Sequence, residues 1–227
     1  MLALPDIPTE RALIKWIEAQ TRSGKPAYAH GCQGPVYLYD SEGLRFVVKA
    51  AVGGGFSGLV RRWMLRREYG AYLRLTDFAG SPRCYGLIDG RYLVLEYIAG
   101  LSLRTARIDD RRTYFDVLFA HIGELHRRGV AHADLKSRDN LLVIAGHLPF
   151  VVDFGAAIVR KPGFAPFNHY LYELARRLDF NAWAKLKYEG RMEELTAEDR
   201  PYYRRTAVEI IARAVRPSYL WLRRRIF

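Results

Sequence analysis

Short apolar runs separated by turn residues dominate the N-terminal part of this chain. Leu44–Ala50 (LRFVVKA) is rich in β-branched and aromatic residues, which predicts a strand. Two further runs, Arg83–Gly90 and Arg91–Tyr97, meet at an Asp89-Gly90 pair, which is typical of a tight hairpin turn. The pattern therefore predicts antiparallel β-structure before residue 98.

Apolar residues recur every three or four positions in three longer segments, as expected of helices that bury one face. In Leu59–Leu75 this spacing places Glu68 on the apolar face. Asp109–Arg128 begins with capping aspartates and is followed by Gly129, which is typical of a helix end. The last helical pattern is Asn168–Leu178. Strands followed by helices indicate the α+β class.

A second hairpin is predicted inside the stretch Gly129–Gly155, which reads GVAHADLKSRDNLLVIAGHLPFVVDFG. Leu141–Ala145 and Leu148–Val152 are short and apolar, and a Gly146-His147 turn falls between them. Such a hairpin brings the residues before its first strand next to those after its second. The polar residues on these two flanks are therefore expected to converge.

The two flanks resemble the catalytic motifs of the protein-kinase-like superfamily. His132-Ala133-Asp134-Leu135-Lys136 with Asn140-Leu141-Leu142 is similar to its catalytic loop, and Asp153-Phe154-Gly155 to its magnesium motif. The resemblance implies a phosphotransferase that uses ATP and Mg²⁺. It implies that Asp134 orients the acceptor hydroxyl, that Lys136 neutralises charge on the transferred group, and that Asn140 and Asp153 bind magnesium.

The catalytic loop departs from the superfamily's pattern in two ways. Asn140 lies six positions after Asp134, where the family usually has five, and Asp139 occupies the usual position. Asp139 is therefore an alternative magnesium ligand, because its carboxylate is also a hard oxygen donor. Ala133 replaces the arginine that usually pairs with a phosphorylated activation segment, so we expect activity that such phosphorylation does not control.

The resemblance also assigns nucleotide-binding residues to the N-terminal half. Gly31, Gly34 and Val36 look like a shortened glycine loop over the phosphates, with Ala29 where the first glycine usually lies. The backbone of Glu96 and Ile98, just after the gatekeeper position Leu95, would meet the adenine edge.

Lys49 and Glu68 resemble the lysine–glutamate pair of the superfamily, because Lys49 lies nineteen positions before Glu68. A carboxylate on the apolar face of a helix is costly unless it is paired, which favours the same partnership on physical grounds. Lys49 would contact the α and β phosphates, and Glu68 would hold it in place.

The glycine-rich segment Gly53–Gly58 fits the pattern G-x-G-x-x-G of dinucleotide-binding folds. That interpretation requires a second strand ending in an acidic residue about twenty positions later. Asp77 lies at that distance but follows a predicted helix. We therefore interpret the segment as a mobile link between a strand and the helix after it.

Positive charge is concentrated in two segments of the chain. The net charge is +12, from 36 Lys and Arg against 24 Asp and Glu, and Arg61–Arg74 (+4) and Arg204–Arg225 (+6) hold ten of the excess charges. The second segment is followed by Ile226 and Phe227 and contains Tyr219 and Trp221. This mixture suits an anionic membrane surface, although solvated arginines explain it equally well. The charge would also allow nucleic acid, which we do not expect as a partner.

The length and the motifs together predict one bilobal kinase-like domain. Residues 1–97 would form an N-lobe with a small antiparallel sheet and one key helix, and residues 98–227 a mainly helical C-lobe with a reduced C-terminal part. Only about a dozen residues separate Gly155 from the next helical pattern, and no Ala-Pro-Glu sequence follows. These features resemble compact atypical bacterial kinases of the RIO type and the lipopolysaccharide-core sugar kinases.

Three functions remain open from the sequence. The first is transfer of phosphate to a sugar of a lipopolysaccharide-type glycolipid, the second is a small serine/threonine-protein kinase, and the third is a non-catalytic nucleotide-binding scaffold. Cys32 and Cys84 do not suggest a disulfide framework, and the N-terminus lacks an export pattern. We therefore expect a cytoplasmic protein that is peripheral at the inner face of the membrane.

Overall fold

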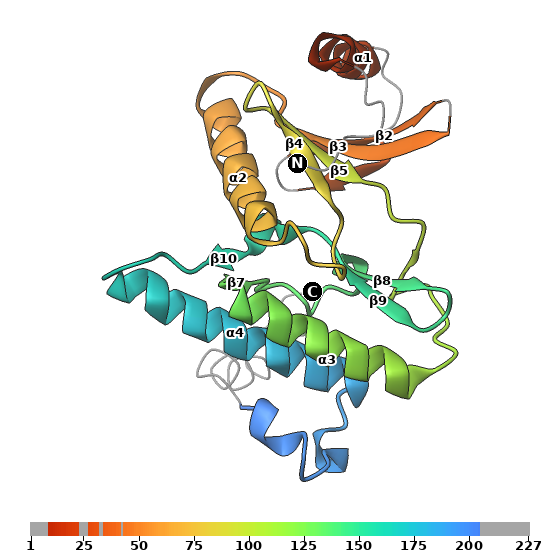
Figure 1. The fold of residues 1–227 in the computed structure, drawn as a ribbon, viewed down its shortest axis with the longest axis vertical. Coiled ribbons are helices and arrows are strands. Elements are labelled where there is room, and N and C mark those ends of the chain that lie inside the picture. Colours follow the sequence, from red (N-terminus) through yellow and green to blue (C-terminus); the bar gives the residue numbers. More distant parts are fainter. Residues whose placement is uncertain (1–8, 23–26, 32–33, 42, 205–227) are drawn as a thin grey trace, which may run out of the picture.

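The computed structural model describes residues 9–22, 27–31, 34–41 and 43–204. These ranges contain four α-helices, ten β-strands and four short 3₁₀ helices, arranged as an upper part built on a sheet and a lower part built on helices (Figure 1). This confirms the predicted α+β class and is compatible with a small bilobal kinase-like fold. Cys32 and nearly all of the basic segment Arg204–Arg225, together with Tyr219–Phe227, lie outside the described residues.

The upper part is a five-stranded antiparallel sheet in the order β1-β2-β3-β5-β4. Its strands are β1 (Ala29–Gly31), β2 (Gly34–Ser41), β3 (Leu44–Ala50), β4 (Cys84–Ile88) and β5 (Tyr92–Glu96). The predicted strand Leu44–Ala50 and the hairpin around Asp89-Gly90 are both confirmed. Asp89 and Gly90 have φ angles of 49° and 59°, as a tight hairpin turn requires.

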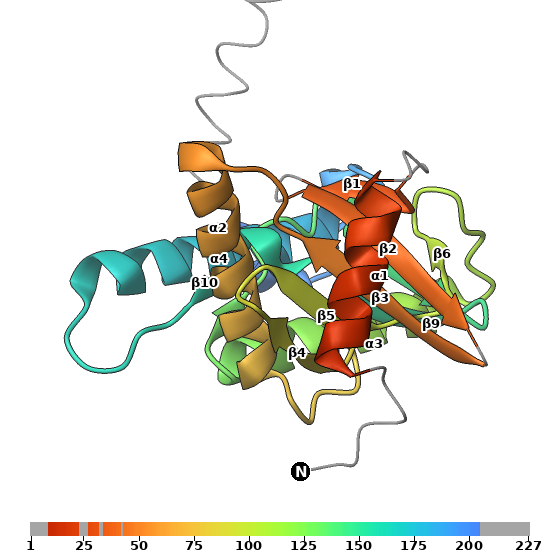
Figure 2. The same cartoon turned by 90° about the horizontal axis from the view of Figure 1, so that it is seen from above.

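Two helices cover opposite faces of this sheet (Figures 1 and 2). Helix α1 (Glu10–Arg22) was not predicted, and its Leu13 and Ile17 pack in a core cluster with Tyr92 and Val94 of β5. The alternate residues Leu93 and Leu95 belong instead to the cluster that contains helix α2. Because side chains alternate along a strand, α1 and α2 must lie on different faces.

Helix α2 (Gly55–Arg74) begins four residues before its predicted start. Gly55 and Gly58 therefore lie in the first turn of the helix, and the prediction of a non-helical link was wrong for Gly55–Gly58. The four residues 51–54 connect β3 to the helix. A Cβ at Gly58 would lie 2.5 Å from the Gly53 carbonyl oxygen, so close packing explains this glycine without any nucleotide.

The lower part is built on helices α3 (Arg111–Arg127) and α4 (Pro166–Lys187), which lie side by side (Figure 1). Asp110 caps α3 by accepting the Thr113 N–H at 3.0 Å. Helix α4 is longer than the predicted Asn168–Leu178, because its apolar stripe continues through Trp183. The Trp183 indole N–H donates to the Phe115 carbonyl at 2.8 Å and ties the two helices together.

Short strands connect these helices to the sheet. Strands β8 (Leu141–Ile144) and β9 (Leu148–Val151) form the predicted hairpin, but its turn is centred on Ala145-Gly146, one residue earlier than predicted. The remaining elements are β6 (Leu101–Ser102), β7 (Val130–Ala131), β10 (Ile158–Val159), η1 (Arg138–Asn140), η2 (Phe154–Ala156), η3 (Met192–Glu194) and η4 (Arg200–Tyr202). No helix in the described ranges is both long enough and apolar enough to cross a bilayer. The proposed lobe boundary at residues 97 and 98 stays a prediction.

We predict that Gly34→Ala lowers the free energy of unfolding by roughly 2 kcal/mol. The φ angle of Gly34 is +141°, which is strained for every residue except glycine, and a Cβ there would lie 2.2 Å from the Ala50 carbonyl oxygen. Gly70→Ala is the matched control, since Gly70 lies within α2 with nothing within 4 Å of an added Cβ. That variant should gain about 0.5–1 kcal/mol from helix propensity. Urea unfolding measures both, and equal stability of the two variants would contradict the structure.

Candidate active site

A lysine from the sheet joins two carboxylates from distant parts of the chain. Lys49 Nζ on β3 lies 2.6 Å from Glu68 Oε1 on α2 and 2.7 Å from Asp153 Oδ1 after β9. The Glu68 side chain is fully buried, that of Lys49 is 14% exposed, and that of Asp153 is 47% exposed. The pairing of Lys49 with Glu68 is the one that their spacing and the apolar position of Glu68 predict.

Lys49 and Asp153 each stabilise the charged form of the other. Burial lowers the pKa of the Lys49 ammonium, but the negative charges of Glu68 and Asp153 outweigh burial and raise that pKa above its ordinary value. Burial raises the pKa of Asp153. The Lys49 charge and the hydrogen bonds from Lys49 and the Gly155 N–H lower that pKa by more than burial raises it, so the net shift is downward. The ion pair is therefore intact at neutral pH.

The backbone at Asp153 is held in an unusual conformation by its neighbours. Asp153 has φ 63° and ψ 76°, a left-handed backbone geometry that residues other than glycine rarely adopt. Phe154 is buried next to it, with its ring 4.9 Å from the His132 ring and 5.1 Å from the Tyr72 ring, centroid to centroid. His132 also bonds the Val152 carbonyl through Nε2 at 3.0 Å. These contacts fix the direction of the Asp153 carboxylate.

Asn140 lies directly against Asp134. Its Nδ2 donates to the Asp134 carbonyl at 3.0 Å and to the Asp134 Oδ2 at 3.1 Å, which leaves Oδ1 as the atom that could bind a metal. Asn140 is the last residue of the short 3₁₀ helix η1.

Asp139 is held by other partners, although it too lines the cleft. Arg104 donates to both of its oxygens at 2.6–3.0 Å, and Ser102 Oγ donates to it at 2.8 Å. The hydrogen bonds from Arg104 and Ser102 lower the pKa of Asp139. This geometry favours Asn140 over Asp139 as the ligand.

Asp179 on α4 is a buried carboxylate that the sequence analysis did not single out. It is 1% exposed and accepts the His132 and Ala133 backbone N–H groups, each at 2.8 Å. It also meets His126 Nε2 at 3.0 Å. The carboxylate thus holds the backbone immediately before Asp134, where Ala133 has a strained φ of 64°. Asp179 lies one position beyond the predicted helix Asn168–Leu178, so the helical pattern did not include it.

These groups surround a cleft of about 470 Å³ between the sheet and the lower part. Its lining includes Leu95 and most predicted site residues, namely Gly31, Gly34, Val36, Lys49, Glu96, Ile98, Asp134, Asn140 and Asp153. Glu68 is buried behind Lys49 and does not line it. Lys136 is exposed on the loop after Asp134 and is also absent from the lining. The volume is typical of small-molecule sites.

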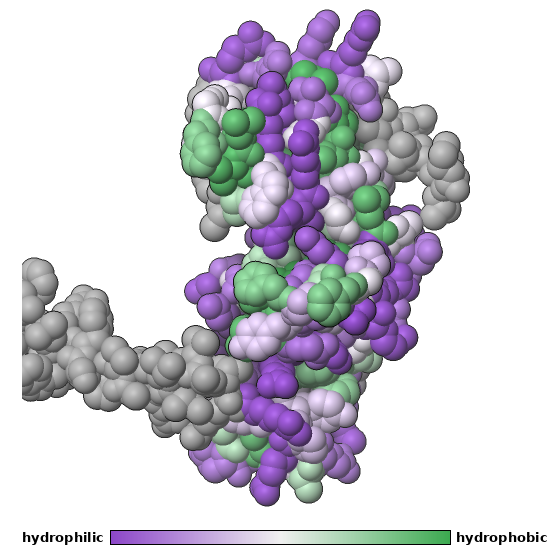
Figure 3. Space-filling model, turned by 90° about the vertical axis from the view of Figure 1, so that its left-hand side faces the viewer, coloured by the Kyte–Doolittle hydropathy of each residue, from purple (hydrophilic) through white to green (hydrophobic). Residues whose placement is uncertain are grey.

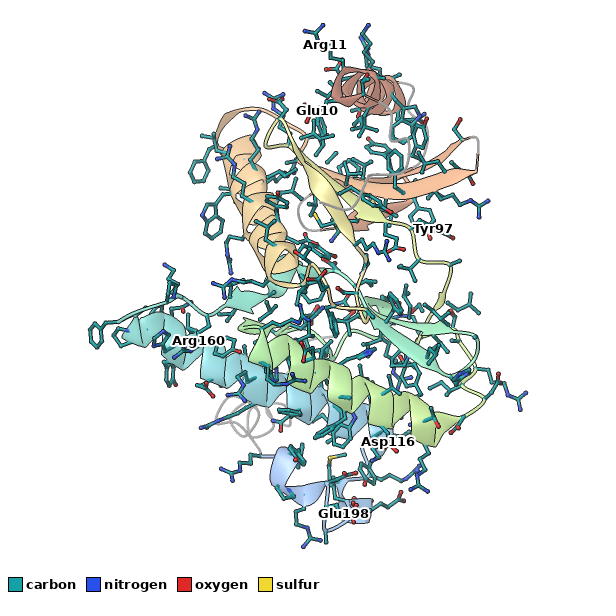
Figure 4. The ribbon with its side chains drawn as sticks, in the orientation of Figure 1. Glu10, Arg11, Tyr97, Asp116, Arg160 and Glu198 are labelled. Atoms are coloured by element: carbon teal, nitrogen blue, oxygen red, sulfur yellow. The ribbon has the colours of Figure 1, made fainter. Side chains whose placement is uncertain are left out.

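The segment that joins the two parts of the protein carries the backbone groups predicted to meet a base. It includes Tyr97, which is labelled in Figure 4. The Glu96 N–H donates to the Arg83 carbonyl at 2.8 Å, and the Ile98 carbonyl accepts the Gly100 N–H at 2.9 Å. A base contact from Glu96 would therefore use its carbonyl, and one from Ile98 would use its N–H.

The donor set fits magnesium bound together with phosphates. Among the described residues, no three His, Cys, Asp or Glu side chains gather to form a metal site by themselves. Asn140 and Asp153 offer two hard oxygen donors, and Mg²⁺ commonly takes one or two protein ligands with phosphate and water completing its shell.

Replacing Asp179 with asparagine should lower the free energy of unfolding by about 3 kcal/mol, because an amide has only one oxygen for three donors. Asp116→Asn is the control, since Asp116 is exposed on α3 (Figure 4) and makes only long ion pairs of 3.8 and 3.7 Å. It should change stability by less than about 0.5 kcal/mol. A small effect at Asp179 would show that the loop backbone does not depend on it.

In the Lys49→Met variant, we predict that stability rises as the pH falls from 7 to 5. Glu68 would be buried without a cation, so its pKa would rise above the unfolded value and the native state would take up a proton. The free energy of unfolding should rise by at most about 1.4 kcal/mol for each pH unit. The wild type should show no such gain between pH 7 and 5, because Asp153 has a lowered pKa and loses its contribution only at pH values below the ordinary pKa of an aspartate.

Urea titrations at several pH values measure these slopes, with Lys15→Met on the exposed side of α1 as the control. A Lys49→Met slope equal to that of Lys15→Met would mean that Lys49 does not neutralise Glu68.

Comparisons with known proteins give partial matches. No protein-family model matches the chain. A 68-residue stretch is 35% identical to "Serine/threonine-protein kinase D" of Synechocystis sp., covering 29% of this chain and 14% of that protein. A 107-residue stretch is 32% identical to "CBL-interacting protein kinase 32" of Oryza sativa subsp. japonica (43% and 24%). A 120-residue stretch is 31% identical to "CBL-interacting serine/threonine-protein kinase 8" of Arabidopsis thaliana (47% and 26%).

The chain therefore spans about a quarter or less of the length of these curated relatives. The similarity is weak and partial, and it includes proteins from a bacterium and from plants that are all named as protein kinases. It agrees with the α+β architecture, in which a sheet-based part sits above a helical part. Together these matches support placing the chain in the protein-kinase-like superfamily.

Proposed function

We propose that this protein is an ATP- and Mg²⁺-dependent phosphotransferase that transfers the γ-phosphoryl group to a hydroxyl. The observation that carries the proposal is the convergence of Lys49, Asp134, Asn140 and Asp153 on one cleft of about 470 Å³. Phosphoryl transfer depends mainly on positioning and on charge neutralisation, and this set supplies a cation, a carboxylate and metal ligands. The lobe boundary that we propose lies between residues 97 and 98.

In this proposal the upper part binds the nucleotide. Lys49 contacts the α and β phosphates, and Glu68 keeps its ammonium at the cleft. Gly31, Gly34 and Val36 cover the phosphates, while the Glu96 carbonyl and the Ile98 N–H meet the adenine edge. Gly34 is also required by its own packing against β3, so its presence alone does not argue for a nucleotide.

The lower part positions the acceptor. Asp134 orients the attacking hydroxyl, and the hydrogen bond from Asn140 Nδ2 holds its carboxylate. A loose transition state removes the hydroxyl proton late, so position matters more than basicity for Asp134. Asn140 Oδ1 and Asp153 would hold magnesium, which neutralises phosphate charge when bound. Lys136 lies exposed two residues after Asp134 and would neutralise charge on the transferred group.

A serine or threonine of a protein is the acceptor that the names of the relatives favour. One structural observation favours a sugar hydroxyl of a lipopolysaccharide-type glycolipid instead. Only ten residues separate Gly155 from the start of α4 at Pro166, which leaves little chain to build a peptide-binding surface. This second candidate goes with a peripheral location at the inner face of the membrane, through the basic C-terminal segment that lies outside the described residues.

The non-catalytic scaffold is the third candidate. It predicts nucleotide binding without transfer, and the presence of Lys49, Asp134 and Asp153 argues against it. Incubation with radiolabelled ATP and Mg²⁺, once with whole-cell protein and once with a lipid extract, separates all three. Label in protein supports the first acceptor, label in glycolipid supports the second, and bound nucleotide with no labelled product supports the scaffold.

Asp134→Ala should reduce phosphoryl transfer by at least about a thousandfold while ATP affinity changes less than about threefold, because the carboxylate acts on the acceptor rather than on the nucleotide. Loss of ATP binding in Asp134→Ala would make Asp134 structural.

Asn140→Ala should raise the Mg²⁺ concentration for half-maximal rate more than Asp139→Ala does, since Arg104 and Ser102 already hold Asp139. Initial rates over a Mg²⁺ series measure this concentration for each variant. The reverse order would make Asp139 the ligand.

A further inference from the structure

A second groove, of about 510 Å³, lies behind the catalytic loop and shares no lining residue with the nucleotide cleft. It is formed by the C-terminal ends of α2 and α3, by the segment after β10 and by the first half of α4. Arg160, labelled in Figure 4, marks its position above α4. Six of its lining residues are cationic, namely Arg74, Arg127, Arg128, Arg160, Lys161 and Arg176.

Nearby carboxylates neutralise only part of this charge. Glu173 is the one carboxylate in the lining, and it pairs with Arg176 at 3.0 Å. Glu124 pairs with both Arg127 and Arg128. The other three cations, Arg74, Arg160 and Lys161, have no ion pair to any carboxylate of the described chain. Three cations, one from the end of α2 and two from the segment after β10, thus line one groove without a carboxylate partner.

Two buried nitrogen atoms of groove residues also have no hydrogen-bond partner within the described part of the chain. They are His126 Nδ1 and Arg176 Nε. The His126 side chain is only 2% exposed, and its other nitrogen meets Asp179. Buried polar atoms without partners are rare and costly, so each of these two nitrogens is expected to bind a ligand or a water. A phosphate suits Nδ1 in either protonation state, because imidazolium donates an N–H and monoprotonated phosphate donates an O–H.

We propose that this groove binds a phosphate group. Guanidinium groups match phosphate oxygens with paired N–H donors, and several of them from different elements can surround one dianion. The site goes beyond the proposed phosphotransferase activity and does not depend on it. Asp179 connects the groove to the catalytic loop. Its carboxylate bonds His126, which lines the groove, and also accepts the backbone N–H groups of His132 and Ala133 in the loop.

Aromatic side chains beside the groove bear on the source of the phosphate. Phe164, three residues after the lining residue Lys161, is 96% exposed, and Phe167 and Tyr170 are 75% and 68% exposed. Figure 3 views this side and shows apolar patches set among hydrophilic surface. The phosphate could belong to a soluble metabolite or to a lipid headgroup, and both sources share the same recognition chemistry.

The test measures binding of two probes to the full chain. Isothermal titration uses glycerol 3-phosphate, and sedimentation uses phosphatidylcholine vesicles with and without phosphatidic acid. R160A/K161A should weaken binding of whichever probe the wild type binds more tightly by at least about tenfold, because the variant lacks two unpaired cations. The probe that binds more tightly identifies the source.

Two controls make the result specific to the groove. R11A/K15A removes the same charges from the exposed side of α1, at the far end of the molecule (Figure 4), and should change binding less than about twofold. R66A/R67A, in the middle of α2 outside the groove, is a second control and should likewise keep soluble-phosphate binding. The proposal is overturned if neither probe binds, or if R11A/K15A or R66A/R67A loses as much affinity as R160A/K161A.

Discussion

The shared ammonium of Lys49 is the interaction on which the arrangement of this protein depends. Its two carboxylate partners come from helix α2 and from the segment after β9, so one side chain fastens the sheet, its helix and the lower part together. Because Glu68 is fully buried, its charge would be costly without that cation. The same geometry leaves Asp153 half exposed at the cleft, where it can meet a ligand.

Much of this site could be predicted because its residues interrupt regular patterns. Lys49 lies in an apolar strand and Glu68 on the apolar face of a helix, and each anomaly requires a partner. The hairpin β8–β9 follows from its apolar runs, so the approach of Asp134 to Asp153 could be expected before any coordinates. The turn within it was misplaced by one residue, because both Ala145 and Gly146 adopt positive φ and only glycine is expected to do so.

Other features could not be predicted, for physical reasons that differ from case to case. Gly55–Gly58 form a helical turn, in which the Gly58 N–H donates to the Gly54 carbonyl at 3.3 Å, although glycine has a low helix propensity. Helix α1 was missed, although Leu13 and Ile17 have the spacing of a buried face. Asp179 acts through backbone N–H groups far from it in sequence, and no local pattern encodes such contacts. Its carboxylate lies between the catalytic loop and the cationic groove, which is how the two sites come to be neighbours.

A crystal structure with a non-hydrolysable ATP analogue and Mg²⁺ tests the central claim most directly. The account predicts α and β phosphates at Lys49 Nζ, with Glu68 still bonded to that ammonium and the metal between Asn140 and Asp153. A nucleotide bound away from Lys49, or a metal held by Asp139 without Asn140, would contradict it.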